Sequence, residues 1–162
     1  MSVSQDTKRL WRRLAVVGVV GVLAAAGLWV AFVRLREDAR LRRVRAANER
    51  EAVLVIDAVA AAQQLYFESR GEYGTFPQLV EANVFRGTLS GDSLVTYGYN
   101  FRLQPTPRAE GRAPAYVVSA DPVSDATGRR HFYAGSDITG IRFHDERPAT
   151  AADPPMLRAD AY

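Results

Sequence analysis

The 162-residue chain contains no cysteine and only two histidines, His131 and His144. Without cysteine, neither a disulfide framework nor a thiolate metal site can form. The zinc-hydrolase motif H-E-x-x-H and the nucleophile motif G-x-S-x-G are also missing. His131 follows two arginines and has no nucleophile or base at motif spacing, so we expect a strand residue there. The sequence therefore predicts a protein that is not an enzyme.

Charge is unevenly distributed along the chain. Residues 1–45 hold ten Lys or Arg and three Asp or Glu, a formal charge of +7. Residues 46–162 hold eleven Arg and fifteen Asp or Glu, a formal charge of −4. A nucleic-acid-binding domain would carry its positive charge on the folded part, so we expect no nucleic-acid partner. The basic segment, 1–13, and the arginines after residue 33 instead suit anionic lipid at a membrane.

Residues 14–33 form a run of twenty residues without charge or proline. A helix of this length rises about 30 Å, which matches the hydrocarbon core of a bilayer. A cleavable signal peptide is the alternative, because small residues at 24–26 offer a cleavage site. The run is longer than a usual signal-peptide core, which favours an uncleaved transmembrane helix.

A long helix is predicted to continue from this segment. Residues 34–50 lack glycine and proline, are rich in Arg and Glu, and predict a charged helical stalk. Apolar side chains then recur at steps of three and four, at Ala52, Val55, Val59, Ala62 and Tyr66. This period predicts an amphipathic helix with one buried face, and Gly71 supplies a residue able to cap its end.

The segment after Gly71 predicts a short helix and several strands. Thr75 and Gln78 have the spacing of a capping box, which predicts a helix over 77–82 with a Gly/Ser loop over 86–93. Alternating side chains predict a strand over 96–103 with Tyr97, Tyr99, Phe101 and Leu103 on one face. Further strands are predicted over 115–120, 129–134 and 140–144, and the Pro/Ala-rich tail, 145–162, is expected to lack regular structure. The expected fold is α+β, a domain over 51–144 in which the long helix packs on a small antiparallel β-sheet.

Short pieces in a fixed order resemble a known family. They are Ala46-Ala47-Asn48-Glu49, then Tyr66 with Tyr73-Gly74 and Phe76-Pro77, Tyr97-Gly98-Tyr99, Ala120-Asp121-Pro122, and the segments 127–133, 139–143 and 149–156. Together with the half-apolar, half-amphipathic helix, these pieces over about 47–157 resemble type IV pilins and type II secretion pseudopilins. The resemblance implies a pilin-like fold and a structural role in a filament or secretion system. It also implies partners among pilin-like or secretion-system proteins, reached through the N-terminal helix.

The N-terminus departs from the pilin pattern. Pilin precursors carry a glycine where prepilin peptidase cuts and a glutamate inside the apolar run, but here Arg12-Arg13 leads directly into Leu14. The alternative is therefore a single-pass protein with an exported ligand-binding or regulatory domain outside any filament. In both cases we expect an inner-membrane protein with a cytoplasmic N-terminus and a periplasmic domain. Six arginines follow the run and four basic residues precede it, a bias that by itself favours a cytoplasmic domain.

Aspartates in the C-terminal loops are the candidate metal ligands. Major pseudopilins bind calcium in this region, so the resemblance makes Asp121, Asp125 and Asp137 candidates for a calcium site. Their spacing matches no EF-hand loop, and aspartate is an ordinary turn residue. We therefore expect no cofactor and treat calcium as the alternative.

Overall fold

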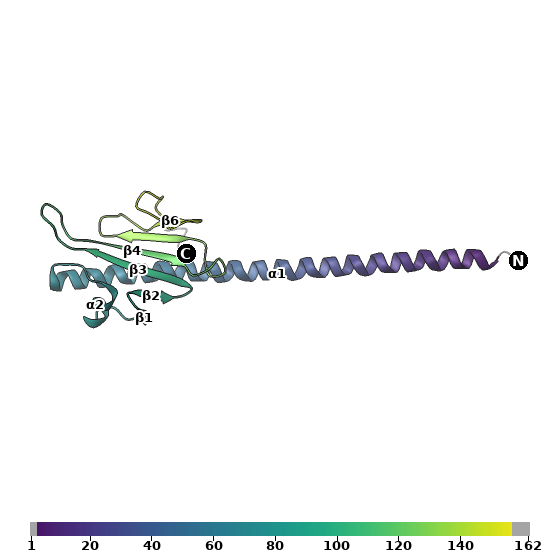
Figure 1. Cartoon of the computed structure of the whole chain (residues 1–162), viewed down its shortest axis with the longest axis horizontal. Helices are drawn as coiled ribbons and strands as arrows, with labels where there is room; N and C mark the ends of the chain where they lie inside the picture. The colour runs from purple at the N-terminus through teal and green to yellow at the C-terminus, as the bar shows by residue number, and fades with distance from the viewer. Residues whose placement is uncertain (1–2, 157–162) are drawn as a thin grey trace. The chain divides into compact units, whose positions relative to one another are not determined.

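The computed structural model describes the backbone of residues 3–156 and the side chains of residues 28–156. The chain forms two units, Met1–Leu41 and Arg42–Tyr162. Helix α1, Val3–Arg70, takes part in both, and the second unit also holds helix α2 and a β-sheet (Figure 1). The predicted basic segment, 1–13, and most of the predicted transmembrane segment, 14–33, fall outside the residues with described side chains. Among the described residues, no helix combines the length and the apolar character needed to cross a membrane.

The C-terminal part of α1 buries one face, as its apolar period predicts. Ala52, Ile56, Val59 and Ala62 are almost wholly buried, and Tyr66 is 6% exposed. Each large apolar side chain removed from water in this way contributes about 1.5–3 kcal/mol. Val55 is only partly buried, whereas Val53, outside the predicted stripe, is buried. The helix ends as predicted: Gly71 has a φ of +72°, and its N–H donates to the Phe67 carbonyl over 2.7 Å.

A buried glutamine fixes the chain reversal after α1. The side-chain amide of Gln63 donates to the Gly74 carbonyl over 2.6 Å and accepts from the Gly74 N–H over 2.9 Å. Helix α2, Phe76–Glu81, follows, and the Thr75 N–H donates to Gln78 Oε1 over 2.7 Å, as a capping box requires. The predicted helix at 77–82 is confirmed with a shift of one residue.

Within residues 3–156, six strands form one sheet in which every neighbouring pair is antiparallel and the spatial order follows the chain. They are β1 Leu89–Ser90, β2 Ser93–Thr96, β3 Tyr99–Thr106, β4 Ala115–Pro122, β5 His131–Gly135 and β6 Arg142–His144. A row of paired residues faces α1 across the sheet, and it contains Leu94, Phe101, Ala120, Phe132 and Phe143. The α+β prediction of a long helix packed on an antiparallel sheet is confirmed for residues 28–156.

The predicted strand over 96–103 is wrong at its beginning. Thr96 pairs with Tyr99, so Tyr97 and Gly98 form a two-residue turn between β2 and β3. Both turn residues have positive φ, 49° and 71°, as in a type I′ hairpin turn. Tyr97 is consequently 52% exposed and does not join the core. The alternating pattern extended the predicted strand across this turn, because Tyr-Gly is not the usual Asn-Gly signature of a hairpin turn.

Other boundaries also differ from the prediction. The expected loop over 86–93 contains β1 and the start of β2, two strands too short for periodicity to reveal. Arg129 and Arg130, expected in a strand, belong to the loop before β5. The tail folds back beside β6, where the Met156 N–H donates to the Ile141 carbonyl over 2.7 Å. Residues 145–156 carry no helix or strand assignment, although Ala149 and Asp153 are buried.

The turn at Gly98 gives a test of the fold. A Cβ at Gly98 would lie 2.5 Å from Thr127 Cβ, whereas a Cβ at Gly111, which has a similar φ of +74°, would meet nothing within 4 Å. Both alanine substitutions incur a left-handed backbone cost of about 1–2 kcal/mol. Gly98→Ala should lose about 1–3 kcal/mol more than Gly111→Ala, because the loop at Thr127 must move. Urea unfolding of the full chain in detergent micelles measures both, and equal losses would contradict the packing of this loop.

Candidate functional site

The loop between β4 and β5, residues 123–130, is held on α1 by three polar side chains of that helix. Arg45 Nε donates to the Asp125 carbonyl, and Asn48 Nδ2 donates to the Thr127 carbonyl over 2.8 Å. Glu49 Oε1 accepts from the Arg129 N–H over 3.2 Å. Positions 45, 48 and 49 share one face of a helix, so this face binds the backbone of the loop along most of its length.

Tyr99 supports the same loop from the sheet. Its hydroxyl donates to the Arg130 carbonyl over 2.9 Å, and a Cβ at Gly128 would lie only 2.2 Å from that hydroxyl. Glycine is therefore required at position 128 by contact. Burial, and secondarily the nearby Glu49 carboxylate, raise the pKa of Tyr99 well above its ordinary range. The hydroxyl stays protonated and serves as a permanent donor to the loop.

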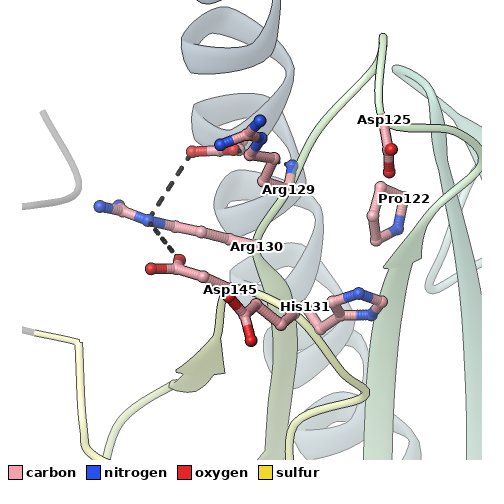
Figure 2. Close-up of a pocket in the computed structure, with 8 residues that line it drawn as sticks. Pro122, Asp125, Arg129, Arg130, His131 and Asp145 are labelled. Carbon is pink, nitrogen blue, oxygen red and sulfur yellow. Dashed lines mark hydrogen bonds and ion pairs between the residues drawn. The ribbon is translucent and has the colours of Figure 1, made fainter.

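Arg130 links three segments at the surface (Figure 2). Its Nε lies 3.8 Å from Glu49 Oε2 on α1 and 3.6 Å from Asp145 Oδ1 after β6. The guanidinium also lies over the Phe143 ring, 5.1 Å from the centroid. Long, partly exposed ion pairs of this kind contribute at most about 1 kcal/mol each. Their role here is to fix the position of the Arg130 side chain.

Asp121 and His131 form a pair that no sequence pattern predicts. Asp121 Oδ1 lies 2.6 Å from His131 Nδ1, and the side chains are 25% and 18% exposed. The register of β4 and β5 pairs Ala120 with Phe132, which places Asp121 opposite His131. A correct alignment of these two strands would have predicted the contact. An Asp–His pair orients an imidazole, but base catalysis also needs a nucleophile or substrate group within reach.

These elements surround a polar hollow of about 610 Å³ on the surface of the second unit. Polar side chains from α1, the 123–130 loop, β5 and the segment after β6 line it (Figure 2). Its lining consists of Glu49, Pro122, Asp125, Arg129, Arg130, His131, Asp145 and Glu146. Among the described residues, the Arg129 guanidinium and the carboxylates of Asp125 and Glu146 have neither hydrogen-bond nor ion-pair partners. The hollow therefore contains both paired charges and free ones.

The three aspartates named as calcium candidates occupy separate places. Asp121 is engaged by His131, Asp125 lines the hollow, and Asp137 accepts from Ser136 Oγ over 2.9 Å in the loop after β5. The Ser136 N–H binds the Tyr116 carbonyl, so Asp137 lies near the start of β4 and Asp121 near its end. Five residues of strand separate these ends, roughly 16 Å. Within residues 28–156 no three Asp, Glu or His side chains form a group suited to a metal ion.

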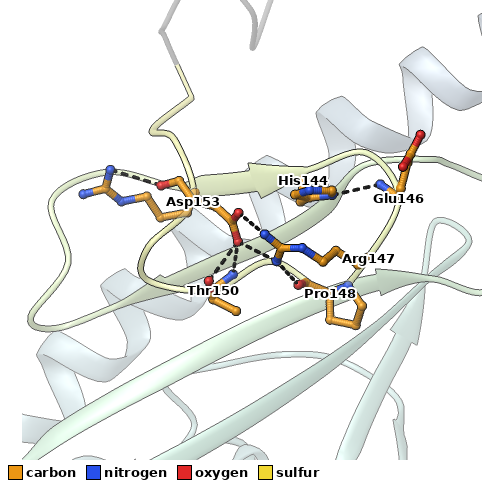
Figure 3. Close-up of polar contacts among 7 residues, drawn as sticks. His144, Glu146, Arg147, Pro148, Thr150 and Asp153 are labelled. Atoms are coloured by element: carbon orange, nitrogen blue, oxygen red, sulfur yellow. Dashed lines mark hydrogen bonds and ion pairs between the residues drawn. The ribbon is translucent and has the colours of Figure 1, made fainter.

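A second polar cluster stabilises the loop after β6, at residues 147–153 (Figure 3). The buried carboxylate of Asp153 accepts from Arg147 Nη2 over 2.6 Å and Nη1 over 3.0 Å, and from the Thr150 N–H over 2.7 Å. The Arg147 hydrogen bonds, followed by those of Thr150, hold the pKa of Asp153 well below its ordinary value. This cluster fixes the loop that returns the chain to the edge of β6.

No family model, no curated protein and no solved structure matches this chain. A long helix packed on an antiparallel sheet is compatible with a pilin-like fold. The pieces that carry the resemblance also meet in space. A Cβ at Gly98 would touch both Thr127 and Asn48, and Gly74 lies against the Tyr66 ring. The quoted pieces therefore mark two junctions at which loops pack on α1.

The Asp153 cluster predicts an acid-dependent loss of stability. Because the folded pKa is lowered, the stabilisation is fully present above the unfolded value of about 3.9 and is lost as pH falls below it. Thermal unfolding of the full chain in detergent between pH 6 and pH 2.5 should show a steeper fall for wild type than for Asp153→Asn. The asparagine variant should be less stable at pH 6, because it lacks the charge that Arg147 pairs. Parallel curves would contradict this assignment.

Proposed function

We propose that this chain is a membrane-anchored, pilin-like structural protein of a type II secretion or type IV pilus-related system. It acts by helix and domain association and performs no bond chemistry. The observation that carries the proposal is the division of α1 into two faces. One face packs on the sheet, and on the other face Leu54 and Leu65 are 50% and 53% exposed.

The exposed face has the spacing of a helix-packing seam. Leu54, Ala58, Ala61 and Leu65 follow one another at steps of four, three and four, and all four are exposed. Leucines separated by alanines let a second helix approach closely. A monomer that leaves such a stripe in water forgoes about 0.8 kcal/mol for each CH₂ group that a partner would bury. These features support pilin-like or secretion-system proteins as the partners of α1.

We propose that residues 14–33 span the inner membrane once, with the N-terminus in the cytoplasm and the domain in the periplasm. The arginines that follow this segment support contact with lipid headgroups, because Arg34, Arg40, Arg42 and Arg43 are exposed and have no ion-pair partner among the described residues. The mildly acidic domain fits no nucleic-acid partner.

The second candidate is an exported ligand-binding or regulatory domain that stands outside any filament. Two observations favour it. Among the residues with described side chains, the polar hollow offers free charges of both signs, and the chain lacks the glycine cut site and the acidic residue of ordinary filament subunits. The two candidates differ in whether α1 has a helical partner in the membrane.

Cysteine cross-linking tests the leading proposal directly, because the wild-type chain has no cysteine. Leu54→Cys and Leu65→Cys place a thiol on the exposed face of α1. Gln104→Cys places a matched thiol on an exposed strand position away from it. In native membranes treated with a mild oxidant, the two helix variants should form disulfide-linked dimers, or should react by bifunctional cross-linker with a pilin-like partner. Gln104→Cys should stay monomeric. Monomer alone from all three variants would sink the proposal.

Topology is tested by a compartment-sensitive reporter. Alkaline phosphatase fused after Tyr162 becomes active only when exported, whereas a fluorescent protein that folds only in the cytoplasm stays dark. We expect active phosphatase and a dark fluorescent fusion, because the resemblance implies an exported domain. The opposite pair of signals would show that the six arginines after residue 33 set the orientation.

A further inference from the structure

The charges around the polar hollow divide into two groups. Glu49, Arg130 and Asp145 bind one another, and Asp121 holds His131. Among residues 28–156, three charged groups of the lining have no partner: the Arg129 guanidinium and the carboxylates of Asp125 and Glu146. Within that described range, the hollow thus presents one free cation and two free anions.

The backbone of each free group is anchored. The Asp125 carbonyl accepts from Arg45, and the Arg129 N–H donates to Glu49, so α1 holds both residues. The Glu146 N–H donates to His144 Nδ1 over 3.1 Å, which ties this residue to β6. The side chains therefore start from fixed points on the rim. Such anchoring reduces the ordering cost that a ligand would otherwise meet.

We propose that the hollow binds a free basic amino acid, lysine or arginine. Such a ligand carries one carboxylate and two cations, the complement of the three free groups. Its carboxylate pairs with the planar Arg129 fork, which suits carboxylate geometry, and its α-ammonium and side-chain cation pair with Asp125 and Glu146. The volume of about 610 Å³ falls within the range of small-molecule sites.

The charge balance argues against other ligand classes. Four carboxylates and two guanidinium groups line the hollow, a formal charge of −2 with neutral His131, which disfavours phosphate and other anions. A divalent cation finds no group of three suitable ligands among residues 28–156. A simple diamine would leave Arg129 unpaired. The inference does not depend on filament membership, since a pilin-like subunit and a free-standing domain would carry the same hollow.

Calorimetric titration of the full chain in detergent micelles tests the proposal with three matched ligands. L-lysine carries all three charges, L-norleucine lacks the side-chain ammonium, and cadaverine lacks the carboxylate. The three free side chains are exposed, so each lost charge-assisted contact should weaken binding up to about fivefold. Lysine should therefore bind about two- to fivefold more tightly than either analogue.

Variants then assign the contacts. Arg129→Gln should weaken lysine binding up to about fivefold and should not weaken cadaverine binding, because only lysine has a carboxylate that pairs with Arg129. The control Arg102→Gln removes an exposed arginine from β3 outside the hollow and should change the affinity for neither ligand. Glu146→Gln tests a second contact. If the side-chain ammonium pairs with Glu146, this variant should bind lysine more weakly and bind norleucine as the wild type does. Near-UV circular dichroism checks that each variant is folded.

Three results would overturn the inference. The first is no heat with millimolar lysine or arginine. The second is equal binding of lysine and cadaverine, which would mean that the hollow does not recognise the ligand carboxylate. The third is an equal loss in Arg129→Gln and Arg102→Gln, which would reduce the effect to overall charge. None of these results bears on cross-linking of α1, so failure here is distinct from failure of the proposed assembly role.

Discussion

The rest of the domain depends on the one-sided burial of α1 between Ala52 and Tyr66. The sheet is a simple meander, and its inner row of Leu94, Phe101, Ala120 and Phe132 has no other described helix of comparable length to cover it. The helix in turn finds in this sheet the apolar surface that its stripe requires. A two-layer arrangement follows, because a helix and a sheet each expose one apolar face that must be removed from water. The packing of the loops and the polar hollow are consequences of that contact.

The polar part of α1 positions the 123–130 loop, as the apolar part positions the sheet. Between residues 45 and 49 the helix no longer offers apolar side chains to the domain. It offers instead an arginine, an asparagine and a glutamate, which bind the backbone of the 123–130 loop. This loop brings Arg129 and Arg130 to the rim of the hollow. The position of the candidate ligand groups is therefore set by hydrogen bonds to main-chain atoms, with Tyr99 and Gly128 fixing the loop from the other side.

The sequence predicted the parts of this structure that repeat and missed those that depend on register. The α1 stripe, the capping box at Thr75 and strand β4 were visible because each follows a period or a fixed spacing. The Tyr97-Gly98 turn was missed because an aromatic residue occupies a position usually held by asparagine. The Asp121–His131 pair was missed because it depends on how β4 and β5 align, and nothing local specifies that alignment. The hollow joins residues almost one hundred positions apart, so only the fold brings Glu49 and Glu146 together.

The two proposals use different sides of the same helix, which makes them compatible. Glu49 faces the loop and the hollow, whereas Leu54 belongs to the exposed stripe. They lie five positions apart, a rotation of about 140° around an α-helix. A partner helix seated on the stripe would therefore leave the hollow open to solvent. Ligand binding and helix association are coupled only if a ligand alters α1 itself, and the direct bonds from Arg45 and Glu49 to the loop are the physical route for such coupling.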